Sequence, residues 1–229
     1  MAGIIDLKNV SKTIEETMIL EDITFQVKPS ECLGIIGPNG SGKTTLLNLV
    51  AGLIKPSTGR IEKNNSVEKH GIGYSMDISG FFPDMSFKNH IKLLYAYKKK
   101  SVDRQELAQF EELFQIDEAF NKPFRNYSSG MKQKLSIISA FIGNPACIIL
   151  DEPTNGLDVD AVFALKNYIA ERETFSPVLL TSHSLNHLET VCDRLIFLKS
   201  GRLIYEGLTK QIVDKYASIE SAYQQIIWT

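Results

Sequence analysis

The residues best suited to chemistry form a glycine-rich run, Gly-Pro-Asn-Gly-Ser-Gly-Lys-Thr, at positions 37–44. The run matches GxxxxGK[S/T] and lies between an apolar stretch at 32–36 and a candidate helix at 44–50, the context of a phosphate-binding loop. Glycines let backbone N–H groups converge on phosphate oxygens, and the N-terminus of the following helix adds positive potential. The plainer alternative, a glycine-rich turn with a surface lysine, is disfavoured by the flanking elements. Phosphate contacts are therefore predicted for Gly37, Pro38, Asn39, Gly40, Ser41, Gly42, Lys43, Thr44 and Thr45.

A second candidate for chemistry is the pair of carboxylates Asp151 and Glu152, which follows an apolar run at 147–150. A strand ending there would place Asp151 near a metal ion and Glu152 where it can polarise a water molecule. In the phosphate loop, Lys43 is suited to the β- and γ-phosphates and the Thr44 hydroxyl to Mg²⁺. Many strands end in acids, so the pair is a weak signal alone and a strong one beside a phosphate loop.

The elements that must position these residues alternate between strand and helix patterns. Apolar runs at 147–150, 178–180 and 195–198 predict buried strands, and a helical pattern separates the first two. Strands that alternate with helices form mostly parallel sheets covered on both faces, so we expect an α/β core. Between 77 and 143 the apolar residues recur at helical spacing instead. This stretch predicts a helical insertion within the core.

The composition is that of an ordinary globular protein. The 229 residues include 25 basic and 27 acidic side chains, a formal net charge of −2. Nucleic-acid-binding proteins usually carry a basic excess, so we expect no nucleic-acid partner. No stretch predicts a transmembrane helix, and the N-terminus lacks the apolar core of a signal peptide. Cys32, Cys147 and Cys192 are widely spaced among apolar neighbours, which is typical of buried thiols in the cytoplasm.

Further motifs, in the right order, resemble those of ATP-binding-cassette (ABC) ATPases over essentially the whole chain. Residues 127–133, Tyr-Ser-Ser-Gly-Met-Lys-Gln, resemble the LSGGQ signature, and residues 155–158, Asn-Gly-Leu-Asp, resemble the D-loop. His183 falls where the family carries its switch histidine, and residues 51–59 fit the run after the first helix. Alone, the two serines would indicate an ordinary helix N-cap and His183 a surface histidine. The order of the motifs outweighs both readings.

The resemblance implies a P-loop NTPase core with a mostly parallel sheet, an N-terminal antiparallel β part and an inserted α-helical subdomain. We expect a single nucleotide-binding domain over residues 1–229. Residues 1–76 and 144–229 would form the ATP-binding core, and residues 77–143 the helical subdomain with the signature.

The resemblance also implies a reaction, the hydrolysis of ATP with Mg²⁺. Glu152 would activate water, His183 would support the γ-phosphate and that water, and Lys43 would bind phosphates. Thr44 and Asp151 would bind Mg²⁺. The signature residues would complete the site of a second nucleotide-binding subunit, a copy or a homologue, so that two subunits enclose two ATP molecules. These residues are Ser128, Ser129 and Gly130.

Three positions depart from the family pattern. Ser129 replaces a signature glycine and adds a β-carbon and a donor, while Gly130 is kept. Ile14 stands where relatives usually stack an aromatic ring on adenine, so we expect a weaker grip on the base. Asp77 stands where relatives carry a glutamine that contacts Mg²⁺ and the attacking water. A carboxylate can bind Mg²⁺, so Asp77 is a candidate catalytic residue and metal ligand. Its added charge predicts slower hydrolysis, a tighter dependence on the metal, or a site that needs its partner subunit to assemble.

These features favour the ATP-hydrolysing subunit of an ABC exporter, peripheral on the inner face of the cell membrane through a separate permease. The signature and the short helical insertion resemble those of bacterial drug and peptide exporters. Phe81 and Phe82 fit a groove for the permease and the core equally well. Two alternatives are a soluble ABC ATPase and a regulatory ATP-binding module that barely hydrolyses. Turnover that depends on Glu152 would exclude the second.

Overall fold

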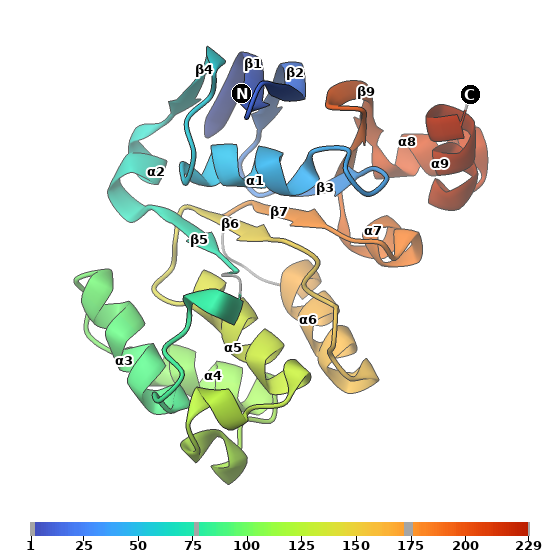
Figure 1. Ribbon diagram of the computed structural model, residues 1–229. Coiled ribbons are helices and arrows are strands. Elements are labelled where there is room, and N and C mark those ends of the chain that lie inside the picture. Colours follow the sequence, from blue (N-terminus) through green and yellow to red (C-terminus); the bar gives the residue numbers. More distant parts are fainter. Residues whose placement is uncertain (1–2, 76–77, 172–175, 229) are drawn as a thin grey trace.

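The computed structural model describes residues 3–75, 78–171 and 176–228, and within them a six-stranded sheet forms the centre of the fold (Figure 1). The strands follow the order β5-β6-β7-β3-β8-β9, in which the first five pair in parallel and β9 pairs antiparallel to β8. The parallel pairing brings the carboxyl ends of β3 and β6, which precede the two candidate motifs, to the same edge. The bounds are β3 Cys32–Ile36, β5 Ile72–Tyr74, β6 Cys147–Leu150, β7 Val178–Thr181, β8 Arg194–Lys199 and β9 Arg202–Leu208.

The central strands are buried on both faces, as their continuous apolar runs predict. In β6, Cys147 and Ile149 pack into one core cluster, whereas Ile148 and Leu150 pack into another on the opposite face. This alternation follows from the two-residue period of a strand. Because both faces of β6 are buried, each of its four positions requires an apolar residue.

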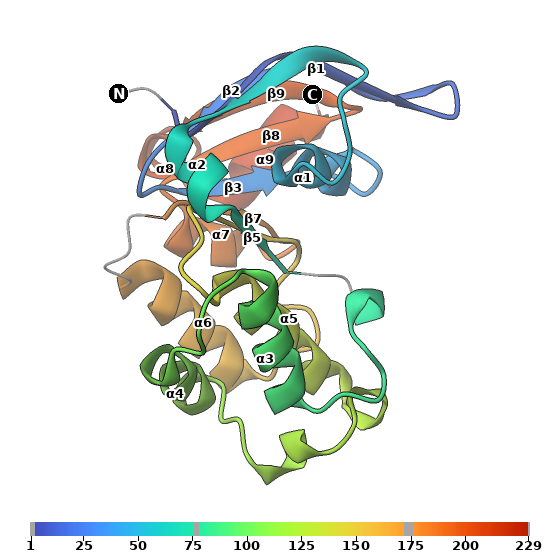
Figure 2. The same cartoon turned by 90° about the vertical axis from the view of Figure 1, so that its left-hand side faces the viewer.

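A second, antiparallel sheet lies over the first and encloses α1 (Lys43–Ala51) between them (Figure 2). It consists of β1 (Ile5–Ile14), β2 (Thr17–Val27) and β4 (Thr58–Lys63), with β1 in the middle. Apolar side chains of α1 share one buried cluster with both sheets. The phosphate loop leads into α1, so this packing fixes its position.

The remaining helices lie on the other side of the central sheet or at its ends (Figures 1 and 2). No helix within the described ranges is long and apolar enough to cross a membrane. The predicted α/β class is confirmed, and the domain boundary at 77–143 stays a prediction. The helices are α2 Asn65–His70, η1 Ile78–Gly80, α3 Phe87–Tyr97, α4 Arg104–Leu113, η2 Glu118–Asn121, η3 Phe124–Asn126, α5 Ser129–Phe141, α6 Val159–Glu171, α7 Leu185–Val191, α8 Thr209–Tyr216 and α9 Ile219–Trp228.

One glycine allows α5 to pack directly on the sheet. A β-carbon at Gly73, in β5, would lie 1.7 Å from the backbone oxygen of Ala140. No side chain fits in that space, so the helix that begins with the signature is held against the strand by backbone contact. The position of α5 relative to the sheet therefore depends on Gly73.

Candidate nucleotide-binding site

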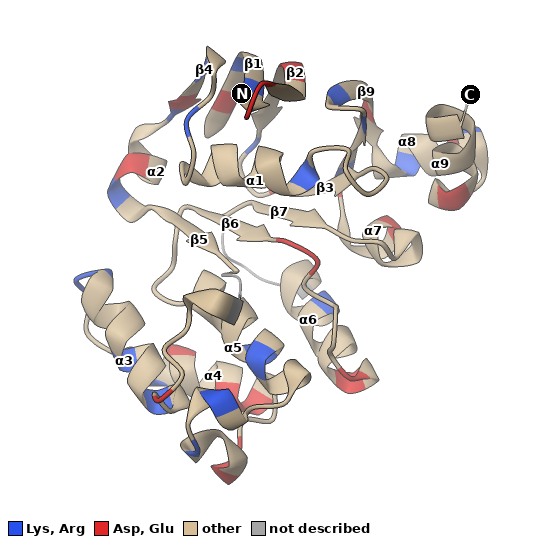
Figure 3. Ribbon diagram, viewed as in Figure 1, with Lys and Arg blue, Asp and Glu red and all other residues tan. Residues whose placement is uncertain are grey.

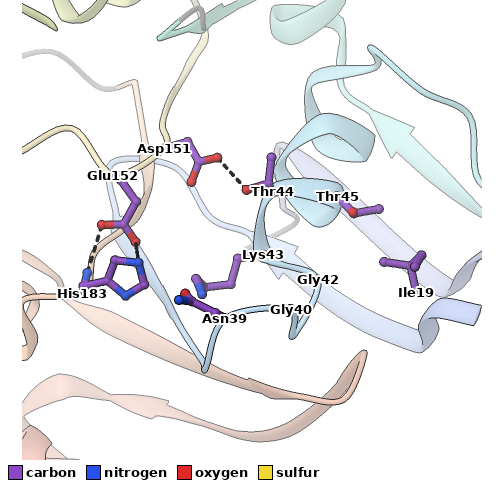
Figure 4. A pocket seen from close by; sticks show the side chains of 10 residues that line it. All are labelled: Ile19, Asn39, Gly40, Gly42, Lys43, Thr44, Thr45, Asp151, Glu152 and His183. Carbon is purple, nitrogen blue, oxygen red and sulfur yellow. Dashed lines mark hydrogen bonds and ion pairs between the residues drawn. The ribbon is translucent and has the colours of Figure 1, made fainter. Parts of the chain in front are cut away.

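Ten residues from four separate segments surround one cavity of about 420 Å³ (Figure 4). The segments are β2, the phosphate loop with the start of α1, and the residues that follow β6 and β7. Nine of the ten residues are predicted from the sequence as site residues, in the phosphate loop, in the carboxylate pair and at the switch histidine, whereas Ile19 is not. The lining residues are Ile19, Asn39, Gly40, Gly42, Lys43, Thr44, Thr45, Asp151, Glu152 and His183.

The phosphate loop presents backbone N–H groups because its chain turns through left-handed conformations. Gly40 has φ 76° and Gly42 has φ 101°, which L side chains rarely adopt. Gly42 is also the N-cap of α1 and carries no side chain to cap the helix. The first turn of α1 holds no acidic residue, so its N–H groups are suited to an anion.

Lys43 places a cation beside these N–H groups. Its ammonium donates to the backbone oxygens of Gly37 at 2.8 Å and Pro38 at 3.2 Å. Burial lowers the pKa of this ammonium, and the charges of Glu152 and Asp151 oppose the shift. A mostly buried cation at the floor of a cavity favours an anionic ligand such as a triphosphate.

The oxygens of Thr44 and Asp151 converge on one side of the cavity. The Thr44 hydroxyl donates to Asp151 Oδ2 at 2.8 Å, and the Thr181 hydroxyl donates to Asp151 Oδ1 at 2.5 Å. The backbone N–H of Asp151 donates to the Ser75 hydroxyl at 3.1 Å, which fixes the main chain that carries this carboxylate. A hydroxyl and a carboxylate held together are ligands that Mg²⁺ accepts, so this pair fits the predicted metal site.

Glu152 is held in a fixed and uncommon conformation. Its backbone φ is 47°, and its N–H donates to the Thr181 hydroxyl at 2.9 Å. One carboxylate oxygen accepts from the backbone N–H of His183 at 3.0 Å, and the other lies 3.4 Å from His183 Nε2 (Figure 4). The second oxygen is buried and accepts no hydrogen bond from the described residues, so it is suited to take a proton from water.

The predicted role of Glu152 as a general base implies an acid limb in the pH dependence of turnover. Burial raises the pKa of Glu152 above its ordinary value of 4.5, although the His183 N–H and ring oppose the shift. A general base works deprotonated, so we expect kcat to fall as pH drops through this raised pKa. Steady-state kcat measured from pH 8 downwards should reach half its maximum above pH 4.5, while circular dichroism shows a folded protein. A midpoint at or below 4.5 would contradict the role of Glu152.

Of the other predicted site residues, none that the structure describes lines this cavity. Ile14 is exposed at the end of β1, and Ile19 of β2 contributes the apolar wall instead. Ser128 to Gly130 lie at the N-terminus of α5, where the Ser128 hydroxyl accepts from the N–H of Met131. Asp77 lies outside the described residues, so its role stays a prediction.

Two residues of the site lay outside the motifs. The Thr181 hydroxyl donates to the Asp151 carboxylate and accepts from the backbone N–H of Glu152, and its signal is a hydroxyl placed directly after the apolar run 178–180. Ile19 follows no motif, and only the pairing of β1 with β2 brings it to the phosphate loop. A sequence search for hydroxyl residues at strand ends would have found the first and missed the second.

Comparison with known proteins places this geometry in a family. The profile described as "ABC transporter" matches residues 20–155, which is more than half of the chain. This chain belongs to the ABC transporter ATP-binding proteins. An ABC transporter ATP-binding protein of Methanocaldococcus jannaschii is 33% identical over 219 residues, covering 94% of this chain and 82% of that protein. The Nod factor export ATP-binding protein I of Rhizobium etli is 28% identical, covering 94% and 72%.

Solved structures of ABC ATPases have the same fold. An ATP-binding subunit of an ABC transporter superposes with a TM-score of 0.86 at 26% identity, covering 97% of this chain and 99% of that one. A dimeric cassette in a post-hydrolysis state, bound to ADP and Pi, gives a TM-score of 0.77 at 26% identity, covering 90% and 98%. This ABC protein is therefore an ATPase, and the expected P-loop NTPase architecture is confirmed.

Proposed function

We propose that this ABC ATPase pairs with a second nucleotide-binding subunit around two ATP molecules and drives export through a separate permease. The observation that carries the proposal is the fixed Glu152 carboxylate, which faces the same cavity as the phosphate loop. The cavity lacks any residue of the signature, so a second subunit is needed to supply it. The dimeric state of the solved relative supports this arrangement.

Each residue has a distinct task in the proposed hydrolysis. The N–H groups of the phosphate loop and Lys43 hold the phosphates, and Thr44 with Asp151 would hold Mg²⁺, which neutralises phosphate charge when bound. Glu152 accepts the proton of the attacking water, and His183 keeps that carboxylate in place through its backbone N–H. Closure of the pair on ATP is the mechanical step, and hydrolysis reverses it.

A groove of about 1110 Å³ beside the site is our candidate for the permease surface. It opens between α1, β5 and α3 and also reaches Asp151 and Glu152. The exposed apolar side chains on its walls would be covered by an apolar helix or loop of the permease. They are Leu53, Phe82, Leu93 and Tyr97. Of the aromatic pair named above, Phe81 is buried as a core residue would be, whereas Phe82 is exposed and therefore open to contact with a permease.

Export is supported by the Nod factor export proteins among the relatives, which are 28% and 30% identical to this chain. Binding to a permease would place the protein on the cytoplasmic face of the cell membrane. The permease, and not this chain, would recognise the exported substrate. The support for export therefore comes from these relatives and from the form of the signature.

Co-purification from membranes tests the permease proposal. Tagged Glu152→Gln protein, isolated from gently solubilised membranes with Mg·ATP, should retain one multi-span protein at a constant ratio in mass spectrometry. Adding Tyr97→Asp should remove it, because Tyr97 is 85% exposed on the groove wall. Trp228→Asp is the matched control, since Trp228 is 75% exposed on α9, away from the groove. Recovery of soluble proteins only, or equal loss in both variants, would contradict the proposal.

A further inference from the structure

The signature helix touches the segment after Glu152 within the same chain. The Gln133 side-chain amide donates to the backbone oxygen of Pro153 at 3.1 Å. A β-carbon on Gly130 would lie 2.9 Å from the backbone oxygen of Gly156, so the two backbones are in close contact there. These two contacts tie the first turns of α5 to residues 152–158 on one side of the groove.

An ion pair adds a third contact at the far end of that segment. Lys134 Nζ lies 3.4 Å from Asp158 Oδ2, and the Lys134 side chain is only 13% exposed. The other oxygen of Asp158 accepts from the N–H of Ala161 at 2.7 Å and so caps α6. Figure 3 shows the basic start of α5 beside the acidic start of α6. One carboxylate therefore joins the signature helix to the beginning of α6.

The segment between these contacts is a series of tight turns. The backbone N–H of Asn155 donates to the backbone oxygen of Glu152 at 3.2 Å, and the backbone N–H of Leu157 donates to the backbone oxygen of Thr154 at 3.3 Å. Such a chain of turns has little freedom to absorb a displacement. A shift of the N-terminus of α5 would therefore be passed to the backbone of Glu152.

We propose that Gln133 and Lys134 are positioning residues that couple each signature to the Glu152 of its own subunit. The inference rests on the proposed function, in which the signature contacts ATP held by the second subunit. Engagement of that ATP fixes α5, and the contacts with residues 152–158 then align the carboxylate at the other site. The two sites consequently hydrolyse cooperatively, although neither positioning residue touches its own ATP cavity.

Steady-state kinetics of the full chain test this coupling. Gln133→Met and Lys134→Met remove the donor and the charge but keep the side-chain length. We expect each to lower kcat about tenfold and to reduce the Hill coefficient for ATP from nearly 2, the number of sites, towards 1. The dissociation constant for a fluorescent ATP analogue should stay within twofold, because Lys43 and the phosphate loop are untouched.

Two matched variants separate coupling from general damage. Lys134→Arg keeps the ion pair with Asp158 and should restore both kcat and the Hill coefficient. Lys215→Met changes a lysine of α8 that lines neither the cavity nor the groove, and whose ammonium lies 4.8 Å from the centroid of the Tyr216 ring, so it should behave as wild type.

The results that would overturn the inference differ from those that would overturn the proposed function. If the wild type neither hydrolyses ATP nor pairs in its presence, the proposed function fails, and this inference fails with it. If the wild type does both, but Gln133→Met and Lys134→Met stay as cooperative as Lys215→Met, the coupling alone is wrong. A wild-type Hill coefficient of 1, or no rescue by Lys134→Arg, would also overturn it.

Discussion

Glu152→Gln is expected to lower kcat for ATP about 10²- to 10⁴-fold, the usual contribution of a general base. The amide keeps the size of the side chain but cannot accept the proton of water. The affinity for ATP should change little, because phosphate binding depends on the loop and on Lys43. Phosphate release under saturating Mg·ATP measures the effect.

Glu62→Gln is the matched control for this variant. Glu62 lies on β4, far from the cavity lining, and pairs with Lys8 at 2.6 Å on the surface. Its removal should leave kcat within twofold. Equal rates for Glu152→Gln and the wild type would mean that another group takes the proton, and would favour the alternative of a regulatory module that barely hydrolyses.

Arg194→Met is expected to lower the free energy of unfolding by about 3–5 kcal/mol, the cost of leaving a buried charge without its partner. The Arg194 side chain is 4% exposed, and its Nε donates to Glu31 at 2.9 Å. It also contacts Glu206 and donates to the backbone oxygen of Gln26 at 2.6 Å. Methionine would leave the buried Glu31 carboxylate without this cation. Urea denaturation followed by circular dichroism measures the loss.

Arg202→Met provides the comparison on the surface. Arg202 pairs with Glu21 through two nitrogens, but its side chain is 62% exposed. Exposed ion pairs contribute about 0–1 kcal/mol, because water and salt screen them. If both variants lost the same free energy of unfolding, the account of a buried ion network that joins β3, β8 and β9 would be wrong.

The central strands were predictable because each requires an unbroken apolar run. The run at 178–180 is extended by one residue in β7, Val178–Thr181, and the run at 147–150 is β6 itself. Residues that must be apolar on both faces leave a local signal. The order of the strands in the sheet leaves no such signal and was not predicted.

Partners that are distant in the sequence could not be predicted. Asp103 and Glu106 have the spacing of a helix capping box, and Asp103 does accept from the N–H groups of Gln105 and Glu106. The Glu106 carboxylate, however, accepts from the N–H of Gly143 at 3.1 Å, 37 residues away. The Glu106 carboxylate thus pairs with a backbone donor that lies outside the capping motif. The local sequence pattern cannot reveal such a partner.

The residues of the site likewise fall into those that the sequence predicts and those that it does not. Residues whose chemistry needs a fixed spacing, such as Lys43 and Thr44, were found from the sequence because one loop and one helix turn position them. Ile19 reaches the cavity from β2, and the buried Thr181 of β7 contacts the cavity residue Asp151, and no spacing in the sequence reveals either contact. Ile14 was predicted as the adenine contact by counting from a family motif. In the structure it is exposed at the end of β1 and does not line this cavity.

The mass of the Glu152→Gln protein in solution tests the central claim most directly. Light scattering on a size-exclusion column should give twice the 25.7 kDa of one chain in Mg·ATP and a single chain in ADP, because the pair closes on ATP and cannot reopen without hydrolysis. The wild type should return to a single chain as ATP is consumed. A single-chain mass for Glu152→Gln while ATP is bound would contradict the account.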